Sequence, residues 1–244
     1  MKKNIVSKIF LLSLVLIITL TACSPNLTKK AKALQVLETG VSSPNTIEEL
    51  EDAIEKYEER IVDITSSHAQ VGIWYKILGS RYLEQKMYGE ALKCYQKAIE
   101  IYPVNQNLYY YVGVCAGYMA NASLDYNATG SSAKRNNYLK LAEQAYLQAI
   151  KIDGNYARAL YGLGVLYTFE MNKSAEAIPY VEKLLTIEKR HTDAMFLLAN
   201  AYCQNGMLDE AVALHDKIES IATSEEKKSA ARTFKKGVLD AQYN

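Results

Sequence analysis

A pattern of small and large residues that returns at a fixed interval is the strongest constraint on how this chain folds. Gly79 and Gly113 are 34 residues apart, and a tyrosine, Tyr75 or Tyr109, stands four residues before each glycine. Repetition at a period of this length indicates a stack of similar units, each of which buries its apolar face against its neighbours. The chain is therefore predicted to fold as an array.

The apolar residues recur at the spacing of an α-helix. Leu50, Ile54, Tyr57, Ile61 and Ile64 follow one another at intervals of three and four residues, which places them on one face of a helix. No later segment alternates between apolar and polar residues as a half-buried strand does. The predicted fold class is all-α.

Four copies of the pattern can be aligned through a small residue in their second half, namely Ala91, Ala142, Ala177 and Ala211. The first interval is 51 residues, so the second copy carries a 17-residue insertion, in the polar stretch around residues 121–137. The second interval is 35 residues, so the third copy has one extra residue, and the last interval is 34. Small residues at these positions let paired helices approach closely.

The first copy reads Tyr75-x2-Leu78-Gly79-x2-Tyr82, then Ala91-x3-Tyr95-x2-Ala98, then Pro103. This spacing resembles the tetratricopeptide repeat (TPR), which implies a solenoid of antiparallel helix pairs. The resemblance places four units at residues 72–105, 106–156, 157–191 and 192–225. Helices at 46–71 and 226–244 are expected to cap the two ends of the array.

The amino terminus has the features of an export signal. Residues 1–22 combine a basic start with an apolar run too short to span a bilayer. Leu20-Thr21-Ala22-Cys23 resembles the lipobox of bacterial lipoproteins, in which the cysteine receives fatty acyl groups such as palmitate. The resemblance implies cleavage before Cys23, a lipid anchor at that residue and a tether over residues 23–45.

Charge and side-chain chemistry argue against two classes of function. Without residues 1–22 the chain has 25 basic and 27 acidic side chains, which is not the basic surface of a nucleic-acid binder. His68, His191 and His215 are dispersed, and no catalytic set is evident, so we expect a non-enzymatic protein without a cofactor. The sequence allows a disulfide among Cys94, Cys115 and Cys203, but their spacing alone does not support one.

One polar stretch has some of the features of a metal site. Asp125-Tyr126-Asn127-Ala128-Thr129-Gly130 resembles the first half of a calcium loop. The twelfth position is Asn136, where a calcium loop needs a bidentate glutamate. We therefore interpret this stretch as a polar loop and predict no metal site.

In TPR proteins the first helix of each pair lines a concave groove. The resemblance carries this role to a set of mostly aromatic and polar residues, with Asp193 on the same face: Lys76, Tyr110, Tyr118, Arg158, Tyr161, Phe169, Phe196 and Asn200. Of the carboxylate clamp found in chaperone-binding TPR domains, only Lys76 and Arg158 are kept, which argues against a chaperone-tail receptor. An aromatic groove with a polar rim suits a peptide or helix of another protein.

The expected function is a lipid-anchored scaffold on the periplasmic side or outer membrane of a bacterial envelope, in an assembly, secretion or transport system. The expected partners are a protein or peptide, which binds in the groove, and the membrane, which holds the lipid anchor. No nucleic acid is expected to bind. The sequence also allows a homo-oligomer. The alternative is a small-ligand or metal-binding accessory lipoprotein of a solute-transport system.

Overall fold

The computed structural model describes residues 46–123 and 133–242. The chain divides into two compact units, residues 1–64 and 65–244. The predicted signal over residues 1–22, Cys23 and the predicted tether over residues 23–45 lie outside the described residues, as does the stretch Asp125 to Gly130.

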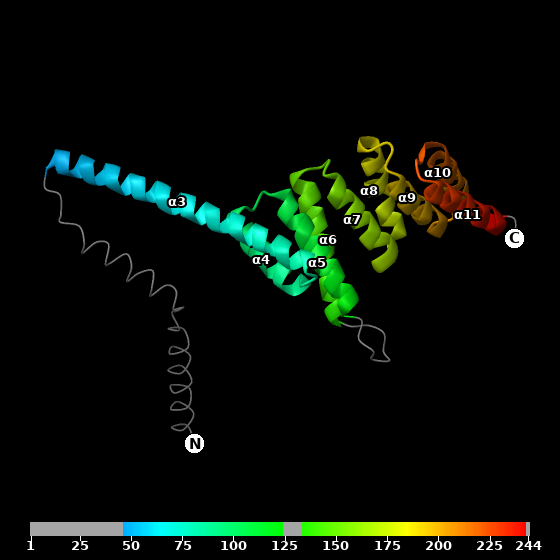
Figure 1. Ribbon diagram of the computed structural model, residues 1–244, viewed down its shortest axis with the longest axis horizontal. Coiled ribbons are helices and arrows are strands. Elements are labelled where there is room, and N and C mark those ends of the chain that lie inside the picture. The colour runs from blue at the N-terminus through cyan, green and yellow to red at the C-terminus, as the bar shows by residue number, and fades with distance from the viewer. Residues whose placement is uncertain (1–45, 124–132, 243–244) are drawn as a thin grey trace, which may run out of the picture. The chain divides into compact units, whose positions relative to one another are not determined.

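The described residues are helical and contain no strand, which confirms the all-α prediction. In the second unit, the helices follow one another as antiparallel pairs (Figure 1). The helices are α3 Ile47–Glu84, which contributes to both units, α4 Tyr88–Ile101, α5 Gln106–Ala122, α6 Ala133–Ile152, α7 Ala157–Val165, η1 Leu166–Glu170, α8 Ser174–Ile187, α9 Thr192–Gln204, α10 Leu208–Ile221 and α11 Glu225–Gln242.

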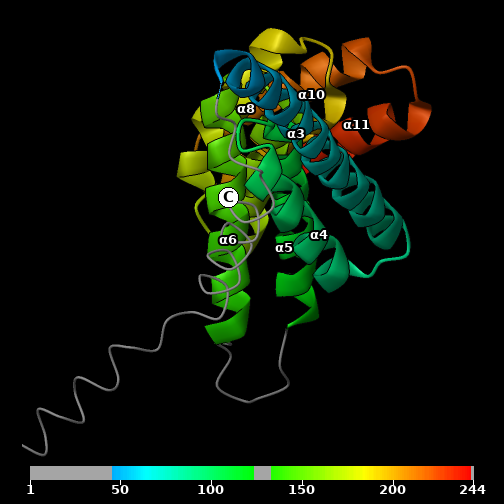
Figure 2. The ribbon, with the colours of Figure 1, turned by 90° about the vertical axis from the view of Figure 1, so that its left-hand side faces the viewer.

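From α4 onward each helix packs on the next along the chain. α5 and α6, the pair that flanks the insertion, lie side by side over much of their length (Figure 2). They are 17 and 20 residues long, against 14 for α4, so part of the insertion lengthens these two helices. The rest of it, residues 124–132, lies outside the described part of the chain.

Glycines let tyrosine rings enter the space between helices. A Cβ atom built on Gly79 of α3 would lie 3.0 Å from the ring of Tyr95 on α4. Likewise, Cβ atoms on Gly113 of α5 and Gly162 of α7 would lie 2.6 and 2.8 Å from Cε1 of Tyr146 on α6. The Tyr146 ring therefore packs against two other helices at positions where any larger residue would collide with it.

The extra residue of the third copy is accommodated as a π-helical turn. The turns after Tyr82 and Tyr202 close when the amide of the fifth following residue, Met87 or Met207, donates to their carbonyl oxygens, at 2.8 and 3.0 Å. After Tyr167 the donor is the sixth residue, Lys173, at 2.8 Å. The additional residue is housed in η1, where Met171 N donates to Leu166 O at 3.0 Å across five residues.

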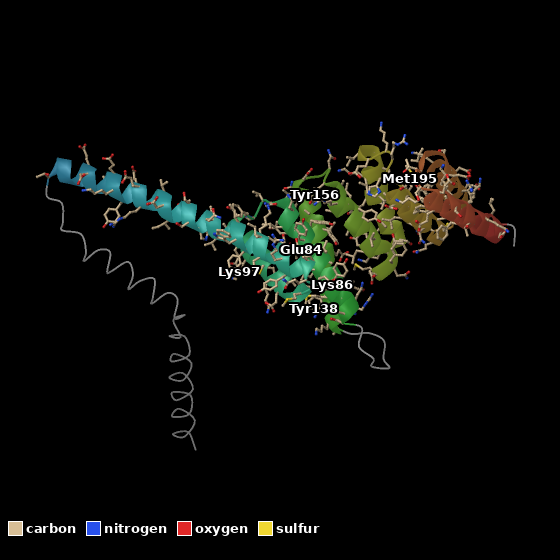
Figure 3. The ribbon with its side chains drawn as sticks, in the orientation of Figure 1. Glu84, Lys86, Lys97, Tyr138, Tyr156 and Met195 are labelled. Atoms are coloured by element: carbon tan, nitrogen blue, oxygen red, sulfur yellow. The ribbon has the colours of Figure 1, made fainter. Side chains whose placement is uncertain are left out.

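The turns that join the helices of a pair need a left-handed backbone. Lys86, labelled in Figure 3, has φ of 60°, Asn172 has 53° and Gly206 has 73°. A residue in this conformation just after a helix lets the following amides bond back to the last carbonyls, as the bonds to Tyr82 and Tyr202 do. In three repeats a left-handed residue therefore stands directly before the residue whose amide closes the turn, although only one of them uses glycine.

Helix α3 differs from the sequence prediction. The amino-terminal cap at 46–71 and the first helix of the repeat at 72 were expected to be separate, whereas α3 continues without a break from Ile47 to Glu84. No proline or turn sequence stands near residue 71. The one weak helix former there, Gly72, is buried where a Cβ would lie 2.6 Å from the ring of Tyr102, so its small size serves packing rather than a turn.

The close contact at Gly113 predicts a difference between two glycines of the same helix. Gly113→Ala is expected to lower the free energy of unfolding by about 1–3 kcal/mol, because the buried Tyr146 ring must move. Gly117→Ala, where nothing lies within 4 Å of the new Cβ, is expected to leave it unchanged or raise it by up to about 1 kcal/mol, since alanine is the better helix former. Urea unfolding followed by circular dichroism measures both, and equal effects would contradict this packing.

Candidate functional site

An apolar cavity of about 710 Å³ lies in the carboxyl-terminal half of the second unit. Four aromatic rings and one imidazole line it: Tyr161, Phe169, Phe196, Phe234 and His215. The remaining lining residues are Asp193, Leu197, Asn200, Cys203, Leu208, Ala230, Thr233, Gly237 and Val238. Cavities of this size hold a small molecule or a few side chains of a peptide.

The repeat register explains which side chains reach the cavity. Phe196, Asn200 and Cys203 of α9 are followed 34 residues later by Ala230, Phe234 and Gly237 of α11, and all six line it. Helix α11 thus occupies the place of the first helix of a fifth repeat. The sequence predicted this segment only as a cap, so its contribution to the cavity was missed; the 34-residue offset from α9 is the signal that could have revealed it.

Helix α11 is held to the array through few apolar contacts and several ion pairs. Ala231 is fully buried, in one cluster with Met195 and Ile218. Arg232 pairs with Glu219 on α10 at 2.7 Å, and Lys235 pairs with Asp216 on the same helix. Phe234 of α11 is 58% exposed and lines the cavity.

Three rings from three helices meet in the cavity wall. The centroid of His215 lies 5.8 Å from that of Phe196 and 6.0 Å from that of Phe234, and the two phenylalanines are 6.1 Å apart. His215 is only 4% exposed, and its Nδ1 has no hydrogen-bond partner among the described residues. Burial lowers the pKa of His215, against a smaller opposing effect of Asp216, so the imidazole is neutral at pH 7.

The carboxylate at the cavity is already neutralised. Asp193 Oδ1 lies 2.7 Å from Lys227 Nζ, which also donates to Thr192 Oγ1 at 3.0 Å. Tyr161 stacks on His191 with centroids 5.3 Å apart, and burial, with the nearby Asp193 charge, raises the pKa of its hydroxyl. The cavity therefore presents apolar area with uncharged polar groups.

Helix η1 supplies the outer ring of the site. Phe169 is 54% exposed and lines the cavity, while its neighbour Thr168 is 3% exposed. The Thr168 hydroxyl finds no partner in the described part of the chain, which is energetically costly. A π turn at this point therefore directs one aromatic side chain outward while burying a polar one.

The structure brings together four of the eight residues predicted for the groove. Tyr161, Phe169, Phe196 and Asn200 line the cavity, and Asn200 Oδ1 accepts a hydrogen bond from Gln204 Nε2 at 2.8 Å. The other four, Lys76, Tyr110, Tyr118 and Arg158, do not line it.

Three of these four residues lie on the earlier helices α3 and α5, and Arg158 lies on α7 together with Tyr161. Tyr118 is 49% exposed and stacks on Tyr88 of α4, with centroids 4.3 Å apart. Tyr110 packs edge-on against Tyr156 at 5.9 Å; the hydroxyl of Tyr156, labelled in Figure 3, donates to Asn107 Oδ1 at 2.7 Å. Lys76 and Arg158 are exposed. The predicted single aromatic strip is thus divided between separate clusters.

The thiols are not suited to nucleophilic chemistry. Cys94, Cys115 and Cys203 are free, and burial raises the pKa of each, to about 12 for Cys115. A protonated thiol is a poor nucleophile. Within residues 46–123 and 133–242, no three His, Cys, Asp or Glu side chains come together as metal ligands would. Over the same residues, no helix has the length and hydropathy that crossing a bilayer requires.

The buried imidazole predicts how stability depends on pH. Because the pKa of His215 is lower in the folded chain, the unfolded chain binds more protons as the pH falls below about 6.5, and the fold loses stability there. Between about pH 7.5 and 5.5, the free energy of unfolding is expected to fall more steeply for the unsubstituted chain than for His215→Gln. A His215→Gln slope equal to that of the unsubstituted chain would contradict the assignment.

Two segments match models of the tetratricopeptide repeat, residues 73–103 and residues 168–226. A "TPR repeat-containing protein" of Borreliella burgdorferi is 26% identical over 206 residues, which cover 83% of this chain and 85% of that one.

Solved structures of similar fold include a thermophilic TPR protein from Thermus thermophilus, with 19% identity and a TM-score of 0.53 over 68% of this chain and 79% of that one. MamA is another, with 22% identity and a TM-score of 0.52 over 76% of this chain and 98% of that one. The chain therefore contains tetratricopeptide repeats, and its helices have the fold of a TPR solenoid.

Proposed function

We propose that this chain is a membrane-anchored, non-enzymatic TPR scaffold that binds a segment of a partner protein in the cavity between η1, α9 and α11. TPR proteins are generally protein–protein interaction scaffolds. The observation that carries the proposal is the cavity of about 710 Å³, which lies where successive first helices of the repeats face one another.

The lining indicates what the partner segment presents. Rings of Phe169, Phe196 and Phe234 offer apolar area, and each large apolar side chain that is buried there contributes about 1.5–3 kcal/mol. The Asp193–Lys227 pair leaves no net charge to attract a basic or an acidic segment. The partner segment is therefore apolar, with one or two large side chains that insert between the rings.

The lipid anchor completes the proposal. Its support is the order of basic start, apolar run, Leu20-Thr21-Ala22 and Cys23 in the sequence. Acyl chains on Cys23 would hold the scaffold at the surface of the bacterial envelope, on the periplasmic side or at the outer membrane. In that position the array collects a partner next to the membrane, as a component of an assembly, secretion or transport system does.

A matched pair of exposed aromatic residues tests the cavity. A photo-crosslinking amino acid at Asn200 is expected to link one partner in the producing cells, and Phe169→Asp is expected to reduce that product at least about tenfold, because a carboxylate enters the apolar binding surface. Tyr118→Asp, at a similarly exposed ring outside the cavity, should leave the product unchanged. If both variants keep their helicity and give equal yields of the crosslinked product, the partner binds to another surface.

The anchor is tested separately. A radiolabelled or alkyne-tagged palmitate is expected to label the chain and to remain in the membrane fraction with it. Cys23→Ala is expected to abolish the label and release the folded chain, because no other residue offers a thiol at a lipobox position. Labelling that persists in Cys23→Ala would refute the lipoprotein assignment without touching the proposal for the cavity.

A further inference from the structure

The first helix of the first repeat exposes a face that every later repeat buries. Trp74 is 61% exposed, Ile77 44% and Leu78 42%. Together with Val71, Tyr75 and Arg81 they line a depression of about 370 Å³ on α3. Large apolar side chains gathered on one exposed face indicate an interaction surface.

The later repeats identify what this face is built to contact. Residues equivalent to Trp74, Leu78 and Arg81 lie 34 positions further on, at Leu108, Val112 and Cys115 of α5. Those three are at most 3% exposed, in a helix that packs on α4 of the preceding pair.

The third and fourth repeats follow the same rule. Their equivalent residues are at most 3% exposed, and their helices pack on the second helix of the pair before. These residues are Ala159, Leu163 and Leu166 in the third repeat, and Ala194, Leu198 and Ala201 in the fourth. The face of α3 around Trp74 therefore has the residues that pack against a preceding helix, without that helix among residues 65–123 and 133–242.

The first unit carries an apolar stripe of the required kind. Ile54, Ile61 and Ile64 are 57%, 61% and 68% exposed, and their spacing places them on one face of the helix. Residues 51–64 also contain six acidic and two basic side chains. This segment thus combines an unpartnered apolar face with a strongly acidic surface.

We propose that two copies of this chain pair, with residues 51–64 of each copy packing against the Trp74 face of the other. Both sets of residues lie on helix α3, and the large apolar side chains of each are exposed in the single copy. The exchange is reciprocal, as a two-fold symmetric dimer requires.

Charge selects this pairing over its alternative. Placing residues 51–64 of one copy against the same residues of the other would oppose two acidic surfaces. Placing them against the Trp74 face brings them near two exposed cations, Lys76 and Arg81. The one acid of residues 65–84, Glu84, pairs with Arg81 at 3.0 Å, so Lys76 is the cation that faces the acidic segment. Opposite charges favour the second arrangement.

Cysteine crosslinking in the intact cell tests which segment covers the Trp74 face. Two differently tagged full-length copies are expressed together, one with Ile61→Cys and the other with Val71→Cys, and a disulfide-linked dimer carrying both tags is expected. The matched control replaces Ile61→Cys by Val62→Cys, a position equally exposed at 63% but about 100° further round the helix. It should give at least about tenfold less product.

Each other occupant gives a distinct result that would overturn the proposal. Linkage between two Val71→Cys copies alone would mean that like faces meet, and linkage within a chain that carries both cysteines would mean an intramolecular cover. A monomeric full-length chain with no crosslink would leave this face to another protein.

The single tryptophan of the chain is Trp74, so its fluorescence reports this face alone. The emission maximum of the purified full-length chain is expected to shift to shorter wavelength as its concentration rises through dimer formation. Ile61→Asp should raise the dimer dissociation constant at least about tenfold and keep Trp74 in water, because a buried charge replaces an apolar side chain. Val62→Asp is expected to leave the dimer dissociation constant unchanged. An unchanged dissociation constant in Ile61→Asp would refute the pairing. Neither result depends on partner binding in the cavity.

Discussion

The close fit between tyrosine rings and glycines is the contact on which the array depends. Tyr146 reaches two glycines, Gly113 and Gly162, on the helices before and after its own, so one side chain sets the separation of three helices. The ring of Tyr95 on α4 fits against Gly79 in the same way and so sets the distance between α4 and α3. Its hydroxyl lies 3.2 Å from Ser80 Oγ. Since interiors are packed as densely as crystals, the spacing of these pairs fixes the distance between helices, and with it the width of the concave side.

Burial of these rings also sets their chemistry. Burial raises the pKa of Tyr95 to about 12 and raises that of Tyr146 further. Both hydroxyls stay protonated, and the Tyr202 hydroxyl donates a hydrogen bond to Glu182 Oε1 at 2.6 Å. The chain has 19 tyrosines. Most of those named here pack between helices, and among the tyrosines only Tyr161 lines the described cavity.

The array could be predicted from the sequence because its spacing is a local property of the chain. The positions of Gly79, Gly113 and Gly164 determine which residues face a neighbouring helix, and the one-residue excess of the third repeat was visible as an interval of 35. Periodicity does not show where a helix stops when no turn residue marks the place, so the continuity of α3 was missed. It also does not show which exposed rings share one hollow. Tyr118 and Phe169 have similar positions in their repeats, but only Phe169 lines the cavity to which α11 contributes.

The π turn of η1 has a consequence for how such an array acquires a new binding surface. One added residue rotates the residues after it by about 100° around a helix, yet the return to register at Asn172 confines that rotation to a single turn. Helices α8 and α9 still pack on each other, while Phe169 of η1 lines the cavity. A repeat protein built in this way can change the outward face of one unit by insertion alone, and the tightly fitted contacts between units are inherited unaltered.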